Sequence, residues 1–193
     1  MKKETLKQII NSFHTASTDE TRYHLSCVLL EVKDKKVTIV STDGHALTKV
    51  MMDDSLLAEH IGDRRYLVTN EQLPILKLML KEMKYLPESQ NMILNEDKSI
   101  QLKSLEYETT LLTEAQLNSK YPNYESIIPA KSAVKPIDKI SFNPILLLNI
   151  TKALGVDKSH GLILQFTGPE NPLLITTGNS EKEDLGVLMP MRM

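Results

Sequence analysis

Cysteine is nearly absent from this chain of 193 residues, and this scarcity limits its chemistry. The single cysteine, Cys27, excludes a disulfide framework and a cysteine-ligated zinc ribbon, and it is typical of a reducing compartment. The five histidines have no metal-ligand spacing with Cys27 or with one another. We therefore expect no metal and no other cofactor, and we interpret Cys27 as a buried, inert thiol.

Glycine-rich loops and long hydrophobic runs are also missing. The seven glycines are scattered and form neither a phosphate-binding loop nor a dinucleotide-binding motif. The uncharged run Ile140–Thr151 is shorter than the roughly 20 residues of a membrane-spanning helix, and no apolar signal peptide is present. We interpret the acidic pairs Asp53-Asp54 and Glu183-Asp184 as solvated turn carboxylates. We therefore predict a cytoplasmic protein without catalytic residues; an unrelated α+β enzyme has no positive support.

Neither sign of charge is in excess. Lysine and arginine number 23 against 25 acidic residues, so a positive surface requires local sorting of charge. The chain is 41% hydrophobic and 25% charged, which is typical of a folded protein. Its length allows one domain or two small ones.

An amphipathic helical pattern occurs three times. Its apolar residues have the i, i+3, i+4, i+7 spacing of a helix with one buried face. The three sets are Leu6, Ile9, Ile10 and Phe13; Leu76, Met79, Leu80 and Met83; and the looser Leu147, Ile150 and Leu154. Pro74 must fall in the first turn of the second helix, and Asn143-Pro144 is a favourable start for the third.

Strand-like segments rich in Val, Leu, Ile and Thr follow each helix. They are Ser26–Val32, Lys36–Ser41 and Ala46–Met51; Asn91–Asn95, Ser99–Lys103 and Tyr107–Leu112; and Gly161–Phe166, Leu173–Thr177 and Leu185–Met191. A strand is also expected before the second helix (Tyr66–Thr69) and before the third (Lys139–Phe142). The sequence thus predicts an α+β fold of three βαβββ units, the first without its opening strand.

The units divide the chain into two parts. Units one and two should form one domain over residues 1–129, and residues 130–137 are the plausible linker. Unit three, residues 138–193, then has no obvious partner inside the chain. It could pair with unit three of a second chain across a twofold axis, or fold back on its own first domain.

Three segments carry further signals. Val40–Leu47 (VSTDGHAL) is typical of a β-hairpin with an Asp43-Gly44 turn. Tyr121–Pro129 (YPNYESIIP) leaves the first domain and could be a packed connector. Val187–Met193 (VLMPMRM) is either a frayed tail or an edge strand whose methionines form an adaptable binding surface.

Together with Arg22–Leu25, these segments resemble the bacterial DNA polymerase III sliding clamp, the beta subunit. That family has an Ala/Ser-Thr-Asp-Gly-His turn, an aromatic-Pro-Asp-Tyr segment ending in Leu/Ile-Pro, and a C-terminus close to Val-Met-Pro-Met-Arg-Leu, in this order. The resemblance matches residues 1–129 to the middle domain, without its first strand. It matches residues 138–193 to the C-terminal half of the third domain, so the chain resembles a shortened clamp.

The resemblance implies a groove for short linear motifs of polymerases, the clamp loader and repair proteins. The implied residues are Leu25, Thr42, Gly44, His45, Leu47, Pro122, Ile127, Val187, Leu188, Met189, Pro190, Met191, Arg192 and Met193. Two positions depart from the family, which often has arginine where this chain has Ala46 and Ser126. Loss of both cations should weaken binding of motifs with acidic or Gln side chains, or change which motifs are preferred.

The resemblance also implies that the helices face duplex DNA without reading its bases. The implied cations are Lys3, Lys7, Lys77, Lys81, Lys84 and Lys152. A solvated lysine face is the alternative.

Two functions follow as hypotheses. One is a replication processivity factor that binds partner motifs and encircles duplex DNA as a homo-oligomer, a dimer or a tetramer. A full ring of the family contains twelve units, so three units per chain would need four chains. The other is a regulator or decoy that forms no ring and competes with a full-length clamp for its partners.

Overall fold

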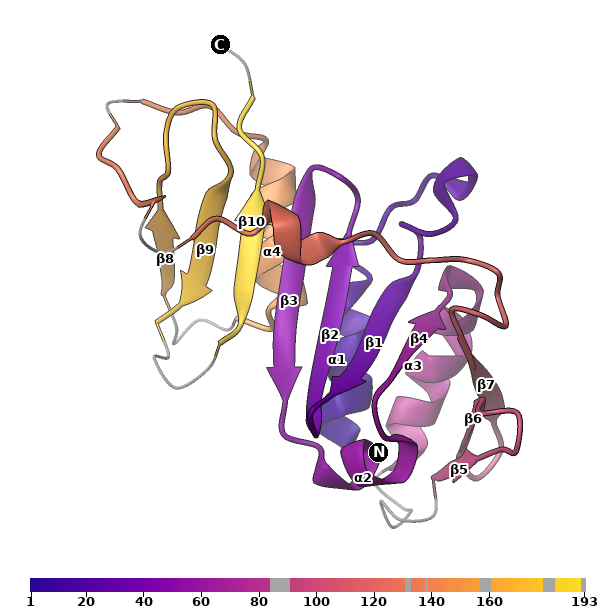
Figure 1. Ribbon diagram of the computed structural model, residues 1–193. Coiled ribbons are helices and arrows are strands. Elements are labelled where there is room, and N and C mark those ends of the chain that lie inside the picture. The colour runs from indigo at the N-terminus through magenta and orange to yellow at the C-terminus, as the bar shows by residue number, and fades with distance from the viewer. Residues whose placement is uncertain (84–90, 131–132, 138, 157–160, 179–182, 192–193) are drawn as a thin grey trace.

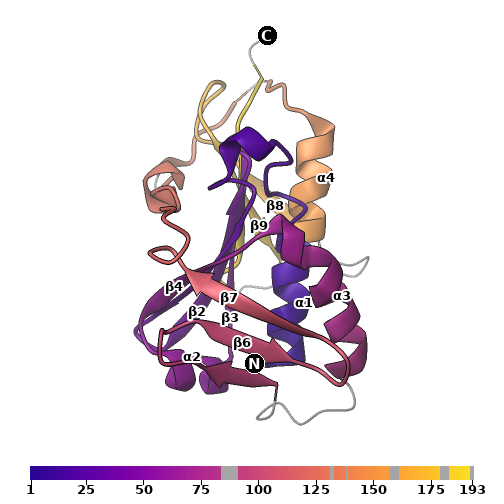
Figure 2. The same ribbon diagram turned by 90° about the vertical axis from the view of Figure 1, so that its right-hand side faces the viewer.

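The computed structural model describes residues 1–83, 91–130, 133–137, 139–156, 161–178 and 183–191. Its strands form one ten-stranded sheet in the order β5-β6-β7-β4-β1-β2-β3-β10-β9-β8. Helices α1, α3 and α4 cover one face of this sheet (Figures 1 and 2). The α+β class and the repeat predicted from the sequence are confirmed.

Unit one follows the predicted pattern. Its elements are α1 (Lys3–Ser12), β1 (Val28–Lys33), β2 (Lys36–Thr42) and β3 (Ala46–Met52). Leu6 and Ile9 of α1 are buried against the sheet, because their spacing places them on one side of the helix. A short helix, α2 (Ser55–Ile61), follows β3 and was not predicted.

Unit two packs beside unit one. It consists of β4 (Arg64–Val68), α3 (Leu73–Glu82), β5 (Met92–Leu94), β6 (Ile100–Lys103) and β7 (Glu108–Thr113). Strand β4 lies between β1 and β7, and α3 packs against α1. Pro74 lies in the first turn of α3, as predicted, where its missing N–H has no helical partner to lose.

Unit three contains α4 (Pro144–Ala153), β8 (Leu162–Gln165), β9 (Leu173–Thr177) and β10 (Leu185–Leu188). The Asn143 side chain caps α4 by accepting a hydrogen bond from the Ile145 N–H at 2.9 Å. The strand predicted over residues 139–142 is wrong, since only Ser141 forms a bridge, to Met191. Helix α4 begins directly after its capping residue Asn143, which leaves too few residues for a longer strand. Asp138 lies outside the described residues.

Strand β10 joins unit three to unit one. It pairs antiparallel with β3, with Gly186 opposite Thr48, Val187 opposite Leu47 and Leu188 opposite Ala46. The expectation that unit three has no partner inside the chain is therefore wrong, because its strand β10 pairs with β3 of unit one. At the other end of the sheet, β8 pairs only with β9 among the described strands.

Three hydrophobic clusters support this sheet. One lies between the helices α1, α2 and α3 and the strands of units one and two, and another lies under α4 in unit three. The remaining cluster, on the opposite face, contains Cys27, Tyr121, Tyr124 and Val187. Among the described residues, no helix has the length and hydropathy to cross a membrane.

Gly186 lets Ile150 of α4 approach strand β10 closely, and this packing generates a stability prediction. A Cβ atom at this position would overlap Cγ2 of Ile150, whereas a Cβ atom at Gly161 would meet no heavy atom within 4 Å. We expect Gly186→Ala to lower the free energy of unfolding by about 1–3 kcal/mol through overpacking. Urea denaturation measures this difference. Gly161→Ala is the control, and equal stability of the two variants would contradict the packing.

Candidate functional site

A cavity of about 550 Å³ opens where units one and three meet. It lies between the β2–β3 turn, the 3-10 helix Tyr124–Ile127 with its following residues, and the loop between β8 and β9. We call it the junction groove. Its lining residues are Thr42, Gly44, His45, Ala46, Leu47, Ser126, Ile127, Ile128, Pro129, Ala133, Lys135, Thr167, Asn171, Pro172, Val187 and Met189.

The β2–β3 turn is fixed by its own side chains. The Asp43 carboxylate accepts hydrogen bonds from the N–H groups of His45 at 2.8 Å and Ala46 at 2.7 Å. The Thr42 hydroxyl donates to the Ala46 carbonyl at 2.7 Å and accepts from the Gly44 N–H at 3.1 Å. Gly44 has a φ of +92°, which a residue with a side chain rarely adopts. The turn therefore holds Gly44 and His45 at the groove.

A half-buried polar network positions the connector that forms the opposite wall. The Tyr124 hydroxyl donates to Glu31 at 2.6 Å, and the Tyr121 N–H donates to Glu114 at 2.6 Å. Arg65 lies 3.3 Å from the Glu31 carboxylate and 3.4 Å from that of Glu114. Burial, followed by the hydrogen bond to Glu31, raises the pKa of Tyr124, so this hydroxyl stays a donor. The network thereby fixes Ile127, Ile128 and Pro129 in place.

The β8–β9 loop closes the groove from unit three. The Thr167 hydroxyl donates to the Pro172 carbonyl at 2.7 Å, and the Asn171 amide donates to the Thr167 carbonyl at 2.9 Å. The Lys135 N–H donates to the Phe166 carbonyl at 2.7 Å, which brings the linker to this loop. Lys135 and His45 are the lining residues with basic side chains, and none of the described lining residues is acidic.

The structure brings together half of the residues that the sequence assigns to the groove. Thr42, Gly44, His45, Leu47, Ile127, Val187 and Met189 line it, as do Ala46 and Ser126, the two departures from the family pattern. Leu25, Pro122, Leu188, Pro190 and Met191 do not line it. Leu188 follows Val187 in β10, so it points to the other face and is buried under α4. Arg192 and Met193 lie outside the described residues.

Sequence reasoning missed the lining residues Ile128, Pro129, Ala133, Lys135, Thr167, Asn171 and Pro172. Ile128 and Pro129 belong to the Tyr121–Pro129 segment that the sequence singled out. The others come from the linker and the β8–β9 loop, which have no periodicity that could indicate their position.

Comparison with known proteins gives a consistent result. No family model matches the chain. It is 29% identical over 132 residues to the beta sliding clamp of Rickettsia bellii, covering 68% of this chain and 33% of that protein. It is 28% identical over 181 residues to the beta sliding clamp of Chlamydia pneumoniae, covering 93% of this chain and 45% of that protein. The chain thus spans less than half the length of these relatives.

Solved structures agree with these relatives. The beta chain of DNA polymerase III from Streptococcus pneumoniae superposes with a TM-score of 0.69 at 17% identity, covering 100% of this chain and 64% of that one. The sliding clamp of Bartonella birtlesii, bound to griselimycin, gives a TM-score of 0.70 at 19% identity, covering 99% and 65%. The fold is that of a bacterial sliding clamp. The resemblance to a shortened clamp, predicted from the motifs, is confirmed.

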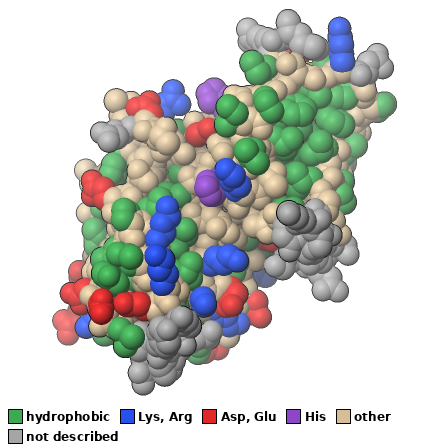
Figure 3. All heavy atoms as spheres, turned by 180° about the vertical axis from the view of Figure 1, so that it is seen from behind, with side chains coloured by type: hydrophobic (Ala, Val, Ile, Leu, Met, Phe, Trp, Pro, Cys, Tyr) green, Lys and Arg blue, Asp and Glu red, His purple; other side chains and the backbone are tan. Residues whose placement is uncertain are grey.

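The helices of this clamp fold place cations on the face opposite the junction groove. Lys3 and Lys7 of α1, Lys77 and Lys81 of α3, and Lys152 of α4 are all exposed. In Figure 3, blue side chains lie over units one and two, whereas green hydrophobic side chains predominate over unit three. Lys84 lies outside the described residues. The structure thus gathers five of the six predicted cations on the helix layer.

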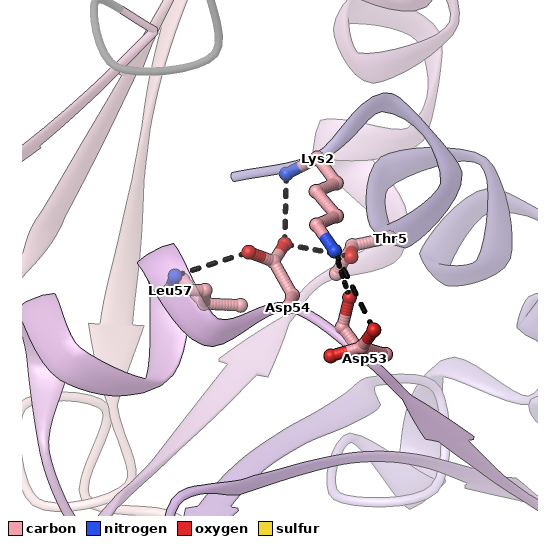
Figure 4. A network of polar contacts seen from close by, with 5 residues as sticks. All are labelled: Lys2, Thr5, Asp53, Asp54 and Leu57. Carbon is pink, nitrogen blue, oxygen red and sulfur yellow. Dashed lines mark hydrogen bonds and ion pairs between the residues drawn. The ribbon is translucent and has the colours of Figure 1, made fainter.

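Asp54 anchors the start of α1 and corrects one prediction. Its carboxylate accepts hydrogen bonds from the Lys2 N–H at 2.7 Å, the Thr5 hydroxyl at 2.7 Å and the Leu57 N–H at 3.0 Å (Figure 4). It therefore satisfies the N-terminal ends of both α1 and α2. The prediction of solvated carboxylates holds for Asp53 and Glu183, which are exposed, and is wrong for Asp54 and Asp184, which are buried. Asp184 accepts from the Met51 N–H at 2.9 Å.

Metal binding has no geometric support among the described residues. Within the parts of the chain that the structure describes, no three His, Cys, Asp or Glu side chains are placed to hold a metal ion. Cys27 is buried, and burial raises its pKa to about 11, so it stays a protonated thiol at neutral pH.

The cations of the helix layer generate a second prediction, which concerns His14, two residues after the end of α1. Partial burial, and then the charges of Lys152 and Lys77, lower the pKa of His14 below 6.5. We expect Lys77→Gln and Lys152→Gln each to raise this pKa, because each removes a positive charge that disfavours imidazolium. A titration followed by NMR measures it. Lys98→Gln, in the β5–β6 turn, is the control, and an unchanged pKa in both test variants would contradict this arrangement.

Proposed function

We propose that this chain is a non-catalytic, clamp-like replication factor of the cytoplasm that binds short linear motifs of polymerase, clamp-loader or repair proteins in the junction groove. The observation that carries the proposal is the groove itself, which three segments far apart in the sequence build together at the junction of two units. The clamp fold and the similarity to beta sliding clamps support it.

The chemistry of the groove suits an extended peptide with one or two apolar anchors. Leu47, Ile127, Val187 and Met189 supply apolar surface, and the exposed thioether of Met189 can adapt to different side chains. Lys135 offers a cation at the wall, where the positions Ala46 and Ser126 offer none. A motif with a carboxylate near Lys135 therefore fits this groove better than one that depends on arginines at those two positions.

The helix layer supports weak, sequence-independent contact with duplex DNA. Exposed lysines on three neighbouring helices attract phosphates without reading base edges. The proposed processivity factor is a homo-oligomer, a dimer or a tetramer, that encircles the duplex.

A regulator or decoy that forms no ring is the second candidate. It is favoured by one observation, since a single chain contains the whole lining of the junction groove and needs no second copy to bind a peptide. Retention on closed circular DNA, with loss from the same DNA after linearisation, is expected of a ring and not of a decoy.

The groove assignment is tested by substitutions at its exposed wall. We expect Ile127→Glu and Met189→Glu each to weaken binding of a fluorescein-labelled clamp-motif peptide at least about tenfold, because each places a charge against an apolar anchor. Fluorescence anisotropy measures the affinity. Ile93→Glu is a matched control, since Ile93 is similarly exposed but lies on β5, remote from the groove. Equal affinity of Ile127→Glu, Met189→Glu and the control would rule out the groove as the peptide site.

The DNA face is tested by salt dependence. We expect the double variant Lys77→Gln, Lys81→Gln to reduce the slope of log affinity against log salt by about 1.8, since each phosphate contact contributes about 0.9. Binding of a fluorescent duplex at several salt concentrations measures the slope. The double variant Lys33→Gln, Lys36→Gln removes the same charge from the β1–β2 turn. A similar change in slope from both double variants would sink the assignment to the helix layer.

A further inference from the structure

Helix α4 exposes apolar side chains to solvent. Ile145 is 63% exposed and Leu148 is 51% exposed. Beside them, Leu162, Leu164 and Phe166 pack against the cluster under α4 but remain only partly buried. We call these five residues the unit-three patch, and Figure 3 shows the hydrophobic side chains that gather on this part of the molecule.

The repeat shows that the exposed residues of α4 are unusual among the three helices. When the core positions Leu6, Leu76 and Leu147 are aligned, Leu148 takes the place of Lys7 in α1 and Lys77 in α3. Ile145 takes the place of Glu4 and Pro74. Lys152 is the single charged residue in α4. Thus α4 has leucine where both counterparts have lysine, and isoleucine where α1 has glutamate.

Units one and two show what covers such a helix. In the first domain, α1 packs against α3, and β1 pairs with β4, so each unit covers a flank of the other. Unit three has α1 and β3 on one flank of α4 and β10. Beyond β8 no further strand pairs among the described residues, and α4 is the last helix of the layer on that side (Figure 1). One more unit of the same kind would complete the layer.

We propose that the unit-three patch binds the same patch of a second copy of this chain, with α4 against α4 across a twofold axis. An isologous contact places each residue near its own copy or its neighbours, so it requires a surface without like charges. The patch meets this requirement, whereas the lysines of α1 and α3 would repel their copies. Duplex DNA is a poor occupant, because phosphates need cations that the patch lacks. This contact gives the proposed oligomer its surface and does not depend on peptide binding.

Solution mass tests the contact. As the concentration rises, the mass measured by light scattering should increase from 21.8 kDa to about twice that value. Leu148→Lys, which restores the residue type of Lys7 and Lys77, should weaken self-association at least about tenfold by burying a charge. Ile93→Lys, at the far edge of the sheet, is the control and should associate like the unaltered chain. Circular dichroism verifies that both variants fold.

A charge-swap experiment tests the symmetry. Leu148→Lys and Leu148→Glu should each stay monomeric alone, and an equimolar mixture should regain the dimer because opposite charges then face each other. A mass of 21.8 kDa for the unaltered chain at all concentrations, dimers of Leu148→Lys, or no recovery in the mixture would overturn the proposal. Peptide affinity measured on the same samples separates the two claims, since Leu148 does not line the junction groove. Dimers that fail to bind peptide would count against the proposed function alone.

Discussion

The pairing of β10 with β3 is the constraint on which the rest of the molecule depends. Four residue pairs in register join unit three to unit one, and the Met189 N–H extends the ladder by donating to the His45 carbonyl at 2.9 Å. The pairing places the β8–β9 loop opposite the β2–β3 turn, and so creates the junction groove. On the other face it places α4 beside α1, where the Gln8 side chain donates to the Ala153 carbonyl at 2.6 Å.

Side chains alternate along β10, so one face of this strand contributes to the junction groove and the other face packs under α4. Val187 points to the groove, whereas Gly186 and Leu188 lie under α4. A shift of one residue in register would exchange the faces, placing Leu188 in the groove and losing the close approach at Gly186. The hydrogen-bonded ladder of β10 ends before Pro190, because proline has no N–H to donate. The same few residues therefore determine the groove and the helix layer together.

Much of this architecture could be predicted from the sequence, because it follows from periodicity. The three amphipathic helices, the ten strands and the hairpin at Asp43-Gly44 all carry local sequence signals, and the burial of their apolar residues agrees with those signals. The short helix α2 was missed because Asp54 was interpreted as a solvated turn carboxylate, whereas its carboxylate caps this helix by accepting from the Leu57 N–H. The strand expected before α4 was wrong because the cap at Asn143 outweighed the apolar run. Groove residues such as Lys135 and Thr167 could not be found, because only the β3–β10 pairing brings their loops to the site.

The three helices of the layer, alike in their buried positions, differ in what they offer to solvent. Lys7 and Lys77 keep α1 and α3 open to water and to anions, whereas Leu148 leaves α4 with an apolar surface that water solvates poorly. Lys152 lies one helical turn beyond Leu148, close enough to His14 for its charge to lower the pKa of that imidazole. A contact centred on Ile145 and Leu148 can thus leave Lys152 at its rim, where the ammonium group remains hydrated. Self-association through α4 and an exposed lysine face on α1 and α3 are then compatible, because they use different helices of one layer.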